Sequence, residues 1–175
     1  MNLTLFCDAS FCPKTKVAGW GAWAKRMEWI EGLIFGGAFK RTFDNNHEAE
    51  LCAIANALFV LKEEGHLTGI TNVMIQSDSL RSLGLIKLKL PSAQIRDHAD
   101  GASILKGVGK SMTETEGVGL SLITKVWSGS FDIQLRHVRG HRQGPSRQWV
   151  NRQCDATAKG HMRDRRDAVL IGKGE

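Results

Sequence analysis

Residues 45–54 read NNHEAELCAI, and within them the spacing of hydrophobic residues changes. Asn45 and Asn46 can cap a helix, and apolar side chains then recur at positions 51, 54, 58 and 61, the spacing of one helical face. The stretch therefore predicts the start of a helix that continues to Gly65. It also divides the 175-residue chain into an earlier β-rich part and a later part in which strands and helices alternate.

The residues before this helix predict three antiparallel strands. Apolar and polar side chains alternate from Leu3 to Asp8, and a turn-forming run follows at residues 11–14. Residues 18–24, AGWGAWA, and residues 29–39 are again rich in aromatic and aliphatic side chains. Segments of this kind, separated by short breaks, are typical of a β-meander.

The residues after the helix predict alternating strands and helices. Residues 73–78, VMIQSD, indicate a short buried strand, and apolar residues at 80, 83 and 86 indicate a small helix after it. The remaining expected elements are helical pieces near residues 99–110 and 118–127, a strand over 131–138 and a closing helix over about 147–162. A strand that returns through a helix runs parallel to its neighbour.

The expected architecture is therefore an α/β fold with a five-stranded mixed sheet flanked by helices. Three strands are antiparallel and two further strands are parallel to the first. Residues 1–163 are expected to form a single domain, followed by a charged tail, residues 164–175, that can fray.

Composition favours a partner with many negative charges. The net charge is +6 and the isoelectric point is about 9.4, which suits phosphate contacts, although a basic surface can also serve solubility alone. No run of apolar residues approaches a membrane span, and the first residues lack the features of a signal peptide. A cytoplasmic protein is expected. No segment indicates an obligatory protein partner, so a monomer is expected too.

Four acidic residues are expected to meet at one edge of the sheet. Asp8 and Asp78 each end a strand, and the carboxyl ends of parallel strands share an edge. Glu50 falls about 60° from the centre of the apolar helix stripe and Glu48 about 100°. These angles favour Glu50 as the side chain that leans over the sheet edge and Glu48 as a solvated neighbour. Glu48 is kept as the alternative ligand. Asp155 lies on the closing helix.

Each acid alone could simply cap a turn or a helix. A cluster of four carboxylates repels itself unless cations neutralise it, and carboxylate oxygens suit Mg²⁺ or Mn²⁺. A zinc site made by Cys7 and Cys12 with His137 and His141 is an alternative with finger-like spacing. It needs a ligand from within a strand, so reduced thiols are the simpler interpretation of these cysteines.

Five motifs in order resemble those of ribonuclease H type 1. They are FCDAS at residues 6–10, NNHEAELCAI at 45–54, QSDS at 76–79, HVRGH at 137–141 and NRQCD at 151–155. One of these alone would be a weak signal. The ordered set spans nearly the whole chain and is specific.

The resemblance implies an RNase H-like fold and a two-metal endonuclease that hydrolyses the RNA strand of an RNA–DNA hybrid, leaving 5′-phosphate and 3′-hydroxyl ends. Two Mg²⁺ ions, with Mn²⁺ as a substitute, would be held by four acids. The implied metal-binding and catalytic acids are Asp8, Glu50, Asp78 and Asp155. The implied proton-transfer or product-release residue is His141, and the implied substrate contacts are Asn45 and Asn151.

The chain also departs from this family. Ala9 stands where the family commonly has glycine. One additional residue lies between the asparagine pair, residues 45 and 46, and the helix acid Glu50. The basic handle that some members use to hold hybrids is not evident between residues 83 and 101. Backbone phosphates are instead expected to meet Lys14, Lys16, Arg139, Arg142 and Arg147. The alternatives are an RNase H-fold nuclease for another nucleic acid, resolvase-like or exonucleolytic, and a non-catalytic nucleic-acid-binding module.

Overall fold

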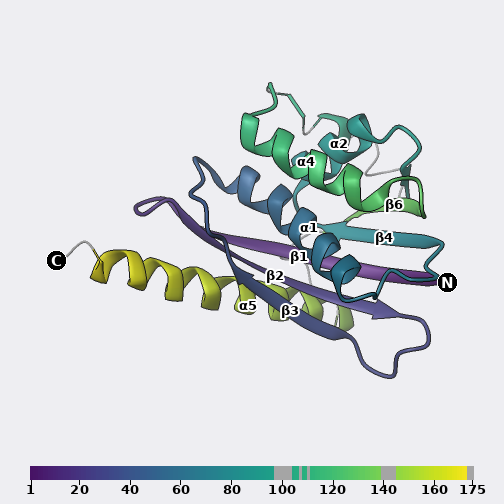
Figure 1. Cartoon of the computed structure of the whole chain (residues 1–175), viewed down its shortest axis with the longest axis horizontal. Coiled ribbons are helices and arrows are strands. Elements are labelled where there is room, and N and C mark those ends of the chain that lie inside the picture. The colour runs from purple at the N-terminus through teal and green to yellow at the C-terminus, as the bar shows by residue number, and fades with distance from the viewer. Residues whose placement is uncertain (97–103, 107, 110, 139–144, 173–175) are drawn as a thin grey trace.

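The computed structural model describes residues 1–96, 104–106, 108–109, 111–138 and 145–172, with the backbone alone at 145–148. A six-stranded sheet with the order β3-β2-β1-β4-β6-β5 forms its centre (Figure 1). The strands are β1 (Asn2–Cys12), β2 (Val17–Arg26), β3 (Leu33–Ala38), β4 (Asn72–Ser77), β5 (Gln94–Ile95) and β6 (Asp132–His137). The helices are α1 (Asn46–Glu63), α2 (Leu80–Lys89), α4 (Glu114–Trp127) and α5 (Pro145–Ile171).

Strand directions agree with the sequence prediction. β1, β2 and β3 form the antiparallel meander, and β4 and β6 then run parallel to β1. The expected number of five strands was wrong, because β5 adds a sixth that pairs in parallel with β6. β5 consists of only 2 residues, too few for alternation of apolar and polar side chains to reveal it in a sequence.

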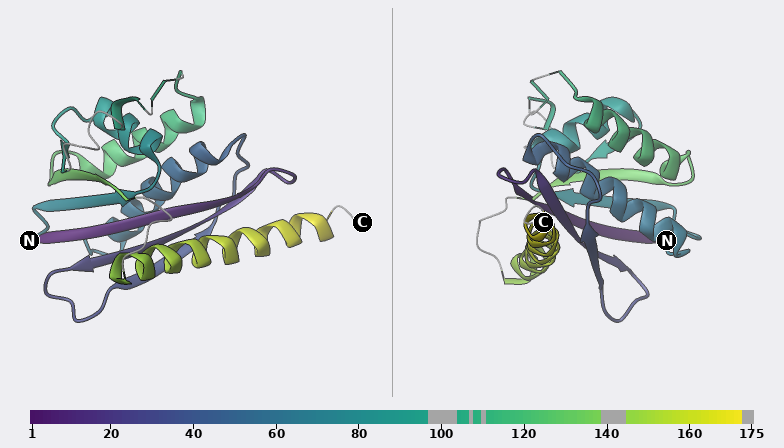
Figure 2. Two further views of the ribbon diagram at one scale, coloured as in Figure 1. Left: turned by 180° about the vertical axis from the view of Figure 1, so that it is seen from behind. Right: turned by 60° about the vertical axis from the view of Figure 1, so that its left-hand side comes forward.

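Helices cover both faces of the sheet (Figures 1 and 2). α1, α2 and α4 lie on one side, whereas α5 crosses the other side beneath β1, β2 and β3. The side chains of β1 alternate accordingly. Leu3 and Leu5 join the main core with α1, whereas Phe6 packs with Val150 and Cys154 of α5. Because side chains alternate between its faces, β1, the strand that carries Asp8, packs against α1 on one side and against α5 on the other.

Two helices begin or end away from their expected positions. α4 begins at Glu114, earlier than predicted, because Thr113 and Glu116 form a capping box. α5 continues through Ile171, beyond the expected end near residue 162, so residues 164–171 continue the closing helix. Arginine and alanine favour helix, and Arg165 Nη2 donates a hydrogen bond to the Lys40 carbonyl at 3.5 Å.

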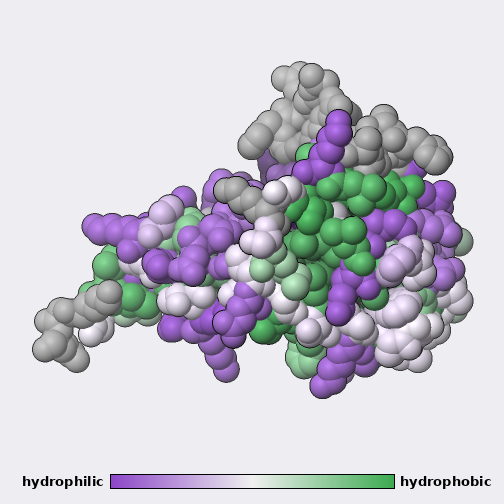
Figure 3. All heavy atoms as spheres, turned by 90° about the horizontal axis from the view of Figure 1, so that it is seen from above, coloured by the Kyte–Doolittle hydropathy of each residue, from purple (hydrophilic) through white to green (hydrophobic). Residues whose placement is uncertain are grey.

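The surface of the helical layer is partly hydrophobic. Figure 3, which looks onto the side that carries α2 and α4, shows hydrophobic side chains gathered over this layer, whereas the projecting end of α5 is mostly hydrophilic. Leu88 of α2 and Val118 of α4 are more than half exposed. Within the described residues, none of the helices combines the length and hydrophobicity needed to cross a membrane.

Candidate active site

Three carboxylates from distant parts of the chain meet at the edge of the sheet. One ligand atom each of Asp8, Glu50 and Asp78 lies within 4.8 Å of the others. The sheet register explains the approach of the two aspartates. Phe6 of β1 pairs with Gln76 of β4, and Asp8 and Asp78 each follow two residues after these partners. This is the edge to which the sequence assigned both aspartates.

The helix acid in this cluster is Glu50. Its side chain is 6% exposed, and its Oε1 accepts a hydrogen bond from Asn46 Nδ2 at 3.2 Å. The expectation that Glu48 lies in solvent was wrong, because it is 3% exposed. Glu48 Oε2 instead accepts from the Asp44 backbone N–H at 3.0 Å, and its own N–H donates to the capping Asn45 Oδ1 at 3.1 Å.

Asp155 approaches from the opposite layer. It lines a hollow of about 320 Å³ together with Asp8, Glu50 and Asp78. Its Oδ2 accepts an ion-paired hydrogen bond from Lys159 Nζ at 2.8 Å, one helical turn later. All four predicted acids thus border one hollow, with three close enough to share a cation and the fourth paired with a lysine.

Burial and repulsion make this site costly to ionise fully. Burial, followed by the charges of Asp78 and Asp155, raises the pKa of Asp8 from its usual 3.8 to about 7. Burial, followed by the charges of Asp8 and Asp78, raises the pKa of Glu50 well above its usual 4.5. The site therefore favours protons or cations over free carboxylates.

Glu50 also supplies an unsatisfied ligand. Among the described residues, its buried Oε2 has no hydrogen-bond partner. A buried carboxylate oxygen without a donor is unfavourable unless a cation approaches it. Carboxylate oxygens are the donors that Mg²⁺ prefers, so these residues fit a divalent cation. Among the described residues, no cysteine or histidine group shares such spacing, so the zinc alternative has no support in this part of the chain.

Comparison with known proteins identifies the family. The model of the RNase H family matches residues 1–163. The chain belongs to the RNase H family. The expected enzyme class, a ribonuclease H, is confirmed by this match. No curated protein sequence matches this RNase H.

Solved structures share the fold of this RNase H at low sequence identity. RNase H1 from Halobacterium salinarum has a TM-score of 0.61 and 16% identity, over 94% of this chain and 99% of that chain. LC11-RNase H1, solved in complex with an RNA/DNA hybrid, has a TM-score of 0.61 and 15% identity, over 93% and 97%. The N-terminal RNase H domain of a Mycobacterium tuberculosis protein has a TM-score of 0.60 and 15% identity, over 93% and 99%.

The other predicted site residues are placed unevenly. Asn151 lines the hollow of the carboxylates, and Asn45 lines a neighbouring one. His141 lies outside the described residues, as do Arg139 and Arg142, and the side chain of Arg147 is not described. His137 Nε2 lies 3.2 Å from the Asp78 carbonyl oxygen, which ties β6 to the end of β4.

Sequence reasoning missed three polar neighbours of the acids. They are Asn46, which contacts Glu50, and Lys159 and Arg152, which line the hollow. Two of them were detectable, because Asn46 precedes Glu50 by four residues and Lys159 follows Asp155 by four, the spacing of neighbours on a helix.

Asp8→Asn is expected to stabilise this RNase H in the absence of divalent cations at pH 8. The raised pKa means that the folded state binds the Asp8 proton more tightly, so stability falls as pH rises from about 4 to about 7 and stays low above that range. The substitution removes this penalty, which for a pKa raised from 3.8 to about 7 is up to about 4 kcal/mol, or roughly 10 °C in Tm. Thermal unfolding in EDTA at pH 5 and pH 8 measures the effect. A stabilisation equally large at pH 5 would contradict the electrostatic cause.

Proposed function

We propose that this RNase H is an endonuclease that hydrolyses the RNA strand of RNA–DNA hybrids and leaves 5′-phosphate and 3′-hydroxyl ends. The observation that carries the proposal is the cluster of Asp8, Glu50 and Asp78, with a buried Glu50 oxygen that lacks a donor among the described residues. The family match and the likeness to LC11-RNase H1, whose structure contains an RNA/DNA hybrid, support the same substrate.

In this proposal the four acids would hold two divalent cations, Mg²⁺ or its substitute Mn²⁺. When bound there, such cations would supply an activated water and stabilisation of the leaving 3′ oxygen. Asp8 contributes from the centre of the sheet, where it lies close enough to Asp78 and Asp155 to feel both charges. Asn46 orients Glu50 through its hydrogen bond, and Lys159 pairs with Asp155 at the rim of the same hollow.

The substrate contacts of the proposal come from polar side chains beside the acids. Asn151 lines the same hollow and is assigned the RNA strand near its 2′-hydroxyl, the group that distinguishes RNA from DNA. Asn45 is assigned the minor groove. His141 is assigned proton transfer or product release, a role that suits a side chain titrating near neutrality. We place the enzyme in the cytoplasm as a monomer, in keeping with its four free cysteines.

A substrate panel tests the proposal. Labelled RNA–DNA hybrid, duplex DNA, duplex RNA and a four-way DNA junction are incubated with the protein in Mg²⁺, in Mn²⁺ or in EDTA. Cleavage confined to the RNA strand of the hybrid, dependent on the cation, is the expected result. Preferred cutting of the junction or of duplex DNA would assign the fold to another nuclease class. Hybrid binding without cutting in either cation would indicate a non-catalytic module.

A further inference from the structure

A second groove continues from the carboxylate site. The hollow lined by Glu50, Asp78 and Ser79 also touches His47 and Arg81. A neighbouring groove of about 540 Å³ begins at those same two residues and runs between the start of α1 and the segment before α4. Its lining includes His47, Arg81, Lys106, Ser111, Thr113 and Glu116. The two grooves therefore adjoin at His47 and Arg81, and the farther one also contains Lys106.

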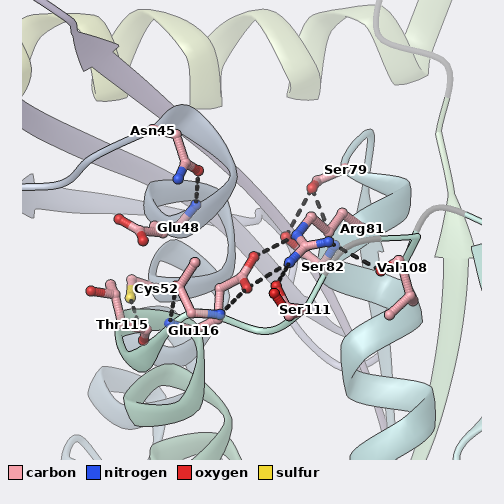
Figure 4. A network of polar contacts seen from close by, with 11 residues as sticks. Asn45, Glu48, Cys52, Ser79, Arg81, Ser82, Val108, Ser111, Thr115 and Glu116 are labelled. Carbon is pink, nitrogen blue, oxygen red and sulfur yellow. Dashed lines mark hydrogen bonds and ion pairs between the residues drawn. The ribbon is translucent and has the colours of Figure 1, made fainter.

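Arg81 holds one wall of this groove in place (Figure 4). Its Nε and Nη2 donate to the two carboxylate oxygens of Glu116 at 2.6 and 2.8 Å, a two-pronged ion pair. Its Nη1 donates to the Val108 carbonyl at 3.2 Å and its Nη2 to the Ser111 carbonyl at 3.1 Å. Every nitrogen of the guanidinium thus donates to the protein, so Arg81 is a tie between segments and not a phosphate ligand.

Glu116 is the buried end of the tie. Its side chain is 1% exposed and that of Arg81 is 12% exposed. Glu116 also accepts from the Thr113 backbone N–H at 2.9 Å, which closes the capping box of α4. The tie therefore joins the first turn of α2, three residues after Asp78, to the first turn of α4 and to the carbonyls between them.

Stability alone is a weak reason for such a pair. A buried ion pair commonly stabilises no more than well-packed apolar residues of similar volume, whereas its fixed hydrogen bonds specify geometry. Here the geometry that is specified is the position of Val108 and Ser111, whose carbonyls Arg81 holds, relative to the start of α2 that follows Asp78. The wall carries Lys106, an exposed cationic side chain in the groove. The chain thus has an exposed basic residue in the groove that adjoins the carboxylate site.

We propose that Arg81 and Glu116 are positioning residues for substrate binding: they fix the groove wall at Ser111 and Thr113 so that Lys106, which lines the same groove, contacts the sugar–phosphate backbone of the duplex beside the carboxylate site. The inference rests on the proposed function, since it takes the duplex to be the substrate of the same site. Lys106 then contributes a phosphate contact, whose signature is a dependence of binding on salt.

The test compares Lys106→Ala, the double variant Arg81→Met/Glu116→Leu, their combination and the distant control Lys62→Ala. Lys62 lies in the last turn of α1, and its replacement by alanine removes the same positive charge as Lys106→Ala. Steady-state cleavage of a hybrid gives kcat and KM, and hybrid binding in EDTA at several salt concentrations gives the salt slope. Tm is measured for each protein.

We expect Lys106→Ala to raise KM about fivefold and to reduce the salt slope by about one, with kcat within about twofold. The double variant is expected to show the same two changes although Lys106 is intact, and adding Lys106→Ala to it is expected to change little more. Lys62→Ala is expected to behave as wild type. Arg81→Lys, which keeps the charge but not the fork, provides the same readout if the double variant fails to fold.

Two results would overturn the inference. One is a double variant, or an Arg81→Lys variant, with unchanged KM and salt slope, which would make the pair structural only. The other is a Lys106→Ala variant indistinguishable from Lys62→Ala. Both results are read against a wild-type protein that cuts hybrid. Failure of the proposed function would appear differently, as a wild-type protein that does not cut hybrid in Mg²⁺ or Mn²⁺.

Discussion

Glu50→Gln is expected to lower kcat for hybrid cleavage roughly a thousandfold, whereas Glu48→Gln on the same helix is expected to leave kcat within about twofold. Only Glu50 has a carboxylate oxygen within the cluster of Asp8 and Asp78. Glutamine keeps the shape of Glu50 but removes the negative charge that a divalent cation needs. Glu48 serves the backbone of Asp44, and a glutamine oxygen can accept that hydrogen bond equally.

The measurement is single-turnover cleavage of a labelled hybrid at saturating Mg²⁺, with circular dichroism to show that both variants fold. Asp8→Asn and Asp78→Asn are expected to lose activity as Glu50→Gln does, because they remove charge from the same cluster. Loss of cleavage in Glu48→Gln together with retention in Glu50→Gln would exchange the roles of the two glutamates. Retention in every variant would exclude this cluster as the catalytic centre.

The sheet and its acidic edge could be predicted because each depends on a local pattern. Alternating side chains in β1 and an apolar run in β4 define the strands, and the right-handed return through α1 makes them parallel neighbours. Asp8 and Asp78 follow from the register. The start of α4 was also available in the sequence, since Thr113 and Glu116 have capping-box spacing. By contrast, nothing local marks β5, whose 2 residues pair only because β6 lies beside them.

Contacts made by the chain folding back on itself could not be predicted. Helical angles alone placed Glu48 in solvent, yet the backbone before α1 folds over it and supplies an N–H donor at Asp44. The Arg81–Glu116 tie joins residues 35 positions apart across two helices, and no periodicity indicates such a pair. The acids whose positions follow from strand order and register were thus predictable. The polar residues that support them depend on tertiary packing and were not.

Gly21→Ala is expected to destabilise the protein by about 2–3 kcal/mol and to lower Tm by roughly 5–10 °C. Gly21 lies opposite Asp8 in the β1–β2 register, where α5 crosses the sheet. A methyl group there would meet the Cys154 carbonyl oxygen and would lie 2.9 Å from Thr157 Cβ. The clash can be relieved only if α5 moves away from β2. Such a movement would displace Asp155, which directly follows Cys154.

The substitution is therefore expected to reduce cleavage as well as stability. A displacement of about 1 Å in a catalytic group can cost on the order of a hundredfold in rate, so kcat is expected to fall at least tenfold even at a temperature where the variant remains folded. Gly160→Ala is the matched control on α5, because nothing lies within 4 Å of the added carbon. Alanine favours helix over glycine, so this control is expected to raise Tm slightly and leave kcat unchanged. A Gly21→Ala protein with wild-type kcat and Tm would show that α5 does not press on β2 at this point, and that Asp155 is not held in the site by the close packing of glycine against helix.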